Sequence, residues 1–324
     1  MLAVMLAAVC CAMLLSLRCG SQNFSLLNLA SAAVEQSPED KVWRILAHVR
    51  IPRTLACLMA GSALAVAGAL IQSVLNNAMA SPNVIGVNAG AGFFALLAAI
   101  CAPQAAGLIP TASFLGALCT ALFIYTLAVR AGLSRTTLIL AGIAVSGMLT
   151  AGVNTITLLY PDVVVGATGF MLGGFSGVTM AALGGAVGYI ALGFIIAAML
   201  SVDLNVLRLG EESAAALGLN VKLTRLLAIL AAALLAGAAV SFAGLLGFVG
   251  LLVPHAARRL IGSDNVWLLP GSALLGGTFV LLCDVLARVL FAPFELPVGI
   301  VMSLLGGPFF LSLLLRHKRG RVYD

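Results

Sequence analysis

The longest uncharged stretch of the chain runs from Arg53 to Arg130, with no Asp, Glu, Lys or Arg between them. One transmembrane helix needs about 20 apolar residues, so this stretch is long enough for three. Polar and turn-forming residues divide it at 76–83 and 101–104. Only 9% of the 324 residues are charged and 62% are hydrophobic, which is too little charge to cover a water-soluble domain. The chain is therefore expected to be a polytopic membrane protein.

The same length rule predicts ten helical spans. A β-barrel is disfavoured because its strands alternate apolar and polar residues, whereas these runs are solidly apolar. The fold class predicted is thus all-α, with residues 1–324 forming one transmembrane domain. The eighth span is interrupted by glycines, and one long bent helix there would leave nine spans. The ten are expected at 1–17, 53–73, 84–101, 107–129, 136–160, 179–201, 224–241, 243–257, 267–291 and 297–315.

The basic residues predict the orientation, because cytoplasmic loops carry an excess of Lys and Arg. With ten spans, both termini lie on the side that holds most of these residues, and that side is expected to be cytoplasmic. Arg18, Lys41, Arg44, Arg50 and Arg53 lie on the other side, and Arg288 lies near the end of a span. The cytoplasmic set is Arg130, Arg135, Arg208, Lys222, Arg225, Arg258, Arg259, Arg316, Lys318, Arg319 and Arg321.

Charged residues inside a membrane are costly, so each one is a candidate for a functional site. Asp284 and Arg288 qualify, with Glu295 just beyond them. Their spacing of four places Asp284 and Arg288 on one helix face, where they can form a neutral pair. The alternative is that Arg288 points outward as a docking charge. The central spans contain no carboxylate, which argues against a proton- or sodium-coupled carrier.

The sequence gives little support for catalysis. Residues 174–177 read G-x-S-G, a pattern typical of intramembrane serine proteases, but Ser176 needs a histidine within hydrogen-bonding reach. His255 is expected at the opposite end of its span, about 30 Å away. The seven cysteines and three histidines are scattered, so we expect no metal site.

Two short segments carry polar residues outside the spans. Residues 203–222 form the largest cytoplasmic loop, and 209–218 should form a short helix with Glu211 and Glu212 at its positive end and Gly218 at its stop. It is either an ordinary surface helix or a rigid knob that fits a partner's groove. Residues 50–53 place two arginines around Pro52 at the outer end of the second span, where they contact lipid phosphates or serve as docking charges.

Six motifs in a fixed order give the chain a family resemblance. They are Arg50–Arg53, Gly61–Gln72, Ala80–Ala91, Leu209–Leu219, Phe248–Arg258, and Asp284–Arg288 with Glu295–Gly299. In these motifs, over nearly its whole length, the chain resembles the iron–siderophore, haem and vitamin B12 permeases of bacterial ABC importers, a FecCD-like family with the type II importer fold. The family usually has a proline before position 82, where this chain has Asn77-Ala78-Met79-Ala80, so it lacks that fixed turn residue.

The resemblance implies a transport machine. It implies ten helices per subunit, a two-fold pair with a second copy or a homologous permease, two cytoplasmic ATPase subunits and an external substrate-binding protein. ATP and Mg²⁺ would be bound by the ATPases, so this chain would hold no cofactor and would not be an enzyme. It would be a multi-pass protein of the bacterial plasma (inner) membrane, in contact with lipid and not with nucleic acid.

The resemblance also implies roles for individual residues. The docking set is Arg50, Arg53 and Arg288. The ATPase-coupling set is Leu209, Gly210, Glu211, Glu212, Ala215, Leu217 and Gly218. The remaining motif positions are structural: Pro52, Gly68, Gln72, Pro82, Gly86, Pro254, His255, Asp284, Glu295 and Pro297.

The implied activity is uptake by alternating access at the dimer interface, driven by the partner ATPases. The implied cargo is a ferric siderophore; haem or cobalamin would use the same machinery. An ion-coupled secondary transporter is the alternative from a different class. The G-x-x-x-G pairs Gly86–Gly90 and Gly184–Gly188 are expected to allow close helix packing.

Overall fold

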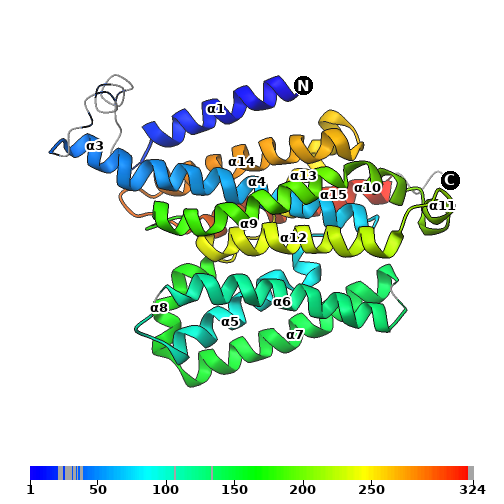
Figure 1. Cartoon of the computed structure of the whole chain (residues 1–324). Helices are drawn as coiled ribbons and strands as arrows, with labels where there is room; N and C mark the ends of the chain where they lie inside the picture. Colours follow the sequence, from blue (N-terminus) through cyan, green and yellow to red (C-terminus); the bar gives the residue numbers. More distant parts are fainter. Residues whose placement is uncertain are drawn as a thin grey trace.

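The structure is a computed structural model that describes residues 1–319 apart from 21–24, 26–30, 32–33, 35, 37–38, 106 and 133; from 313 onward only the backbone is described. Within these residues the regular structure is helical, which confirms the all-α class (Figure 1). The elements are α1 (Leu2–Arg18), α3 (Lys41–Ile45), the π-helical turn η1 (Leu46–Arg50), α4 (Ile51–Val74), the 3-10 turn η2 (Pro82–Ile85), α5 (Val87–Cys101), α6 (Leu108–Arg130), α7 (Arg135–Leu159), α8 (Pro161–Leu172), α9 (Met180–Met199), α10 (Ser201–Leu207), α11 (Glu211–Ala216), α12 (Val221–Ala243), α13 (Val249–Ile261), α14 (Asn265–Val289) and α15 (Val298–Arg319).

The helices form one bundle whose long members run side by side (Figure 1). The labels for both chain ends lie toward the same end of the bundle as α11, and α3 and α8 lie toward the other. We call the α11 end the inner end and the α3 end the outer end. The C-terminal basic cluster that contributes to the predicted orientation lies in part at 320–324, outside the described residues.

Each of the ten predicted spans overlaps a helix, but the start of the eighth is wrong, and α8 and the short helices α3 and α10 were not predicted. Among the described residues, six helices are long and apolar enough to cross a membrane by themselves. The eighth span begins at Val249 and not at 243, because Gly244 (φ 69°) ends α12 and a short loop follows. Helix α8 was not expected at all. The break predicted at 161–178 is a helix as far as Leu172.

The core of the bundle is α4, which packs on α12 and α14. It is built almost entirely of small and aliphatic residues, and 78% of its most apolar 18-residue stretch is buried. A side chain at Gly61 would collide with the carbonyl group of Gly276, and one at Gly276 with that of Gly61. The backbones of α4 and α14 therefore touch directly. Gly68 meets Gly250 of α13 in the same way.

Helices α7 and α9 leave most of their surface exposed at the side of the bundle. Only 11% of the most apolar 18-residue stretch of α7 is buried, so most of its surface is free for lipid or another subunit. The two predicted glycine pairs differ in outcome. Gly90 packs against Gly116 of α6, and Gly86 (φ 73°) provides the left-handed turn that starts α5. A side chain added at Gly184 or Gly188 would meet nothing within 4 Å among the described residues, so neither glycine provides close helix packing within this subunit.

Candidate functional site

Three charged side chains from two helices meet at the outer end of the bundle. Asp284 of α14 is fully buried, and its two carboxylate oxygens lie 2.9 Å from Nη2 of Arg53 and 2.9 Å from Nη2 of Arg288. Arg53, near the start of α4, also reaches Glu295, with 2.7 Å between Nη1 and Oε2. Glu295 lies in the loop before α15, so the network joins three parts of the chain. The predicted Asp284–Arg288 pair is confirmed, and Arg53 is its unpredicted third member.

The network also holds the end of α1. The last carbonyl groups of a helix have no partner inside that helix, and cations are favourable there. Arg50 donates to the carbonyl of Arg18 (2.9 Å) and Arg288 to that of Cys19 (2.8 Å). Arg288 also donates to Oγ of Ser16 (3.0 Å). These arginines thus cap α1 and fix it against α4 and α14.

The structure corrects one expectation about the docking set. Arg50, Arg53 and Arg288 were expected to present their charges outward, but their exposures are 5%, 7% and 4%. The reason is that two of them are neutralised by Asp284 and Glu295, and two are used as caps for α1. At this end of the bundle the exposed basic side chains of α3 are Lys41 and Arg44.

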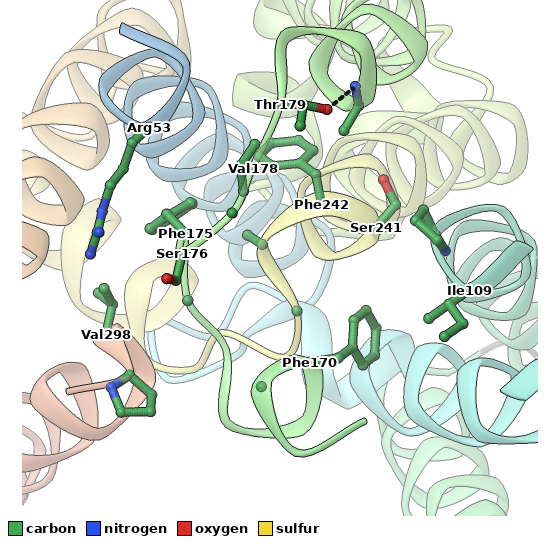
Figure 2. Close-up of a pocket in the computed structure, with 18 of the residues that line it drawn as sticks. Arg53, Ile109, Phe170, Phe175, Ser176, Val178, Thr179, Ser241, Phe242 and Val298 are labelled. Carbon is green, nitrogen blue, oxygen red and sulfur yellow. Dashed lines mark hydrogen bonds between the residues drawn. The ribbon is translucent and has the colours of Figure 1, made fainter. Parts of the chain in front are cut away.

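A cavity of about 440 Å³ lies beside the network (Figure 2). Its wall is mostly apolar, with Phe170, Phe242 and Val298 among the labelled residues, and Arg53 and Glu295 also line it. Ser176 lies on the loop between α8 and α9 that forms one side of the cavity. The described residues that line it include no histidine, the base that the G-x-S-G interpretation requires beside Ser176. The protease alternative gains no support.

The coupling segment, residues 209–218, lies at the inner end between α10 and α12. Its helix, α11, covers only Glu211–Ala216, and Ala214 is its buried side chain. Gly218 (φ 84°) ends it with the hydrogen bonds of a Schellman motif: the Leu219 amide donates to Ala214 and the Gly218 amide to Ala215.

The exposed side chains of the coupling segment frame a projecting knob. Leu209 and Leu217, at its two ends, are 65% and 66% exposed, and Glu212 and Ala215 are exposed between them. Glu211 is held by Arg225 of α12. A short, backbone-locked helix with apolar ends suits a partner's groove.

The other motif residues lie where helices cross. Gln72 donates to the carbonyls of Ala80 (3.0 Å) and Gly250 (3.2 Å), and it accepts from Arg258. This pairing links α4 to both ends of α13 and was not predicted. The prolines of these motifs lie at helix starts or inside helices. Pro52 lies in the first turn of α4, and Pro82 begins η2 and packs on Gly250. Pro254 lies inside α13 beside His255, and Pro297 precedes α15 and lines the outer cavity.

In the described part of the chain, no three His, Cys, Asp or Glu side chains lie close enough together to hold a metal ion. Three linked polar residues at the inner end were not predicted: Asn205 of α10, Asn265 of α14 and Ser73 of α4. Each is a single polar residue at a helix junction. Only their position next to span boundaries could have drawn attention to them.

The sequence and the structure were both compared with known proteins. The model of the FecCD transport family matches residues 6–316. The hemin transport system permease protein of Yersinia pestis is 37% identical over 95% of both chains. The iron(3+)-hydroxamate import system permease protein of Bacillus subtilis is 36% identical, over 97% of this chain and 83% of its own. A solved structure described as an inward-facing metal-chelate type ABC transporter superposes with a TM-score of 0.85, at 28% identity, over 97% of this chain and 98% of its own.

Proposed function

Because the chain belongs to the FecCD transport family, we propose that it is the membrane-spanning permease subunit of an ABC importer that takes up an iron chelate. The observation that carries this proposal is the family match, which runs from α1 into α15 and leaves out no element of the bundle. The permease itself forms and breaks no covalent bond. ATP hydrolysis belongs to the partner subunit.

The assembly proposed has a second copy of this chain, or a homologous permease, two ATPase subunits that bind ATP and Mg²⁺, and an external substrate-binding protein. The open faces of α7 and α9 leave room for the second permease subunit and for lipid. The knob of the coupling segment, with Leu209 and Leu217 exposed at its ends, is the contact for an ATPase. Small residues at this contact let two rigid surfaces approach closely.

The docking role of Arg50, Arg53 and Arg288 is proposed in a revised form. Buried arginines cannot meet a partner's carboxylates directly unless their present partners let go. We infer that the exposed Lys41 and Arg44 make the first contact and that the arginine network shapes the surface below them. The proposed setting is the plasma (inner) membrane, with both termini and the coupling segment in the cytoplasm and α3 outside.

The cargo proposed is a ferric siderophore, with haem or cobalamin as the alternative. The relatives named above handle hemin and iron(3+)-hydroxamate. The absence of a clustered set of metal ligands among the described residues fits the passage of a whole chelate rather than a bare ion. Alternating access is the mechanism, with ATP-dependent contacts at the coupling segment shifting the balance between outward- and inward-open states.

An ion-coupled secondary transporter is a weaker candidate. Such a carrier needs a carboxylate that can release a proton or bind Na⁺ near the path. Asp284 is fully buried but is held by two arginines, and Glu295 is held by one of them. Neither is placed for that task.

The test is reconstitution of the permease with its ATPase subunits and binding protein in nanodiscs. A ferric hydroxamate, hemin and cobalamin are each loaded on the binding protein, and the ATPase rate is measured. The cognate chelate should stimulate hydrolysis. Replacing Glu211 and Glu212 with Lys, and Ala215 with Trp, should abolish that stimulation. Uptake into vesicles that continues without ATP would overturn the proposal.

A further inference from the structure

The helix before the coupling segment, α10, buries Leu204 and Leu207 in the bundle and is hydrogen-bonded to the start of α14 through the amide side chain of Asn205. Asn205 donates from Nδ2 to Oδ1 of Asp264 (2.6 Å). Its Oδ1 accepts two hydrogen bonds from Asn265, one from the backbone N–H (2.8 Å) and one from Nδ2 (2.9 Å). An amide oxygen has two acceptor sites, so both are in use. The next turn adds a bond from Arg208 to the carbonyl of Ser263.

The receiving side of this contact is the start of α14. Asp264 is the N-cap of α14, since its Oδ1 also accepts from the Val266 amide (3.0 Å). Asn265 is fully buried, and its Oδ1 accepts from Oγ of Ser73 on α4 (2.9 Å). One continuous set of hydrogen bonds therefore runs from α10 through the first residues of α14 into α4.

This joint leads into the closely packed pair of helices α4 and α14. Beyond Ser73 and Asn265, helices α4 and α14 touch backbone to backbone at Gly61 and Gly276. At their outer ends the same two helices are tied by Arg53 and Asp284. A displacement delivered at the inner end of α14 thus has no soft side-chain layer to absorb it. Closely packed, hydrogen-bonded elements of this kind are what carries coupling between distant sites.

The coupling segment has two routes into the bundle. One is direct, through Glu211 to Arg225 of α12. The other passes through α10, which ends at Leu207, three residues before Gly210 (φ 109°). The first reaches α4 only through the packing of α12 on it, whereas the second is hydrogen-bonded to the start of α14 and, through Asn265, to α4.

We propose that Asn205 is a positioning residue that transmits movement of the coupling segment to the α4–α14 pair. The inference rests on the proposed function, because it takes the coupling segment to be the ATPase contact. Asn205 touches neither ATP nor cargo. Its task is to hold α10 on the N-cap of α14, so that both move together when the ATPases close.

The test exchanges the two polar partners. Asn205→Asp brings a second carboxylate to within hydrogen-bond distance of Asp264, and the two repel. Asp264→Asn alone is the matched control, because an amide oxygen still accepts from Asn205 and from Val266. The double variant removes the repulsion: the new carboxylate at 205 still accepts from Asn265 and now faces a neutral amide at 264.

The readout is made in the permease–ATPase complex in nanodiscs. A spin label is attached at Ser176→Cys, on the exposed outer loop, in a background without native cysteines. The proposed assembly has two permease subunits, so it carries one label on each. The distance between these two labels is measured without nucleotide and after trapping with Mg²⁺, ATP and vanadate. Binding of the ATPases and their hydrolysis rate are measured in the same samples.

The wild-type complex should change its label distance on trapping, and Asp264→Asn should behave like it. Asn205→Asp should still bind the ATPases, but the fraction of complexes that changes distance should fall about tenfold, the scale typical of one coupling contact. The double variant should regain the response. A merely structural residue would change thermal stability without this loss and rescue. A full response from Asn205→Asp overturns the proposal for Asn205. A wild-type complex that binds no ATPase overturns the proposed function instead.

Discussion

Replacing Asp284 with Ala should destabilise the subunit more than any other single charge removal at the outer end. Asp284 is fully buried and faces Arg53 and Arg288 at 2.9 Å each. At an effective dielectric constant of about 20, each pair is worth roughly 4 kcal/mol of gross attraction. The variant leaves two arginines buried, although Arg53 keeps Glu295 and Arg288 keeps the carbonyl groups of α1.

The net cost of breaking a buried pair by removing one partner is about 3–5 kcal/mol. We place Asp284→Ala in that range and not at twice its value, because both arginines retain acceptors. Glu295→Gln is the matched control. Its carboxylate is 34% exposed and an amide still accepts from Arg53, so the cost should be about 1 kcal/mol or less.

The assay is thermal unfolding of the purified permease in nanodiscs, followed by circular dichroism with size-exclusion chromatography as a check on aggregation. Asp284→Ala should lower the midpoint by several degrees, and Glu295→Gln by about one degree or less. The double variant should cost more than the sum, because Arg53 then loses both carboxylates. Equal midpoints for wild type and Asp284→Ala would refute the view that this network is structural.

Two further predictions follow from the same structure. Charge reversal at Lys41 and Arg44 should weaken docking of the binding protein in a pull-down at low salt without moving the thermal midpoint. Arg50→Glu with Arg53→Glu should lower both the docking and the thermal midpoint. Unchanged docking in the Lys41 and Arg44 variant would contradict the revised docking surface. Gly61→Ala should abolish a monodisperse peak in size-exclusion chromatography, because the added side chain meets the Gly276 carbonyl. Gly184→Ala, on an open face of α9, should leave the thermal midpoint unchanged or raise it slightly. Equal behaviour of the two variants would argue against direct α4–α14 contact.

The sequence predicts the span positions well because hydropathy alone decides which segments enter a bilayer. It fails where a local signal has two meanings. Pro161 and Asp162 lie in the gap between the spans expected at 136–160 and 179–201, yet a proline at the first position and an acid in the first turn are also typical of a helix start, and α8 begins there. The glycines after 243 were assigned to a span, but Gly244 ends α12 instead.

The outer site was predictable only in part. The spacing of Asp284 and Arg288 on one helix is local information, and the pair forms as expected. Arg53 lies 231 residues from Asp284 in the chain, and a single sequence holds no record of such a contact. Arg50, Arg53 and Arg288 lie at the same end of the bundle, but whether a side chain faces water or a buried carboxylate depends on packing that charge counts cannot show.

The caps on α1 have a consequence for how the protein is made. Helix α1 precedes α14 in the chain, and the side chain that binds Ser16 belongs to Arg288, 272 residues later. Until α14 has been inserted, the last turn of α1 has none of the Arg288 bonds that hold it in the finished subunit. Arg50 and Thr54 can hold α1 as soon as the start of α4 has been made, so the attachment of α1 is completed in two steps that lie far apart in synthesis.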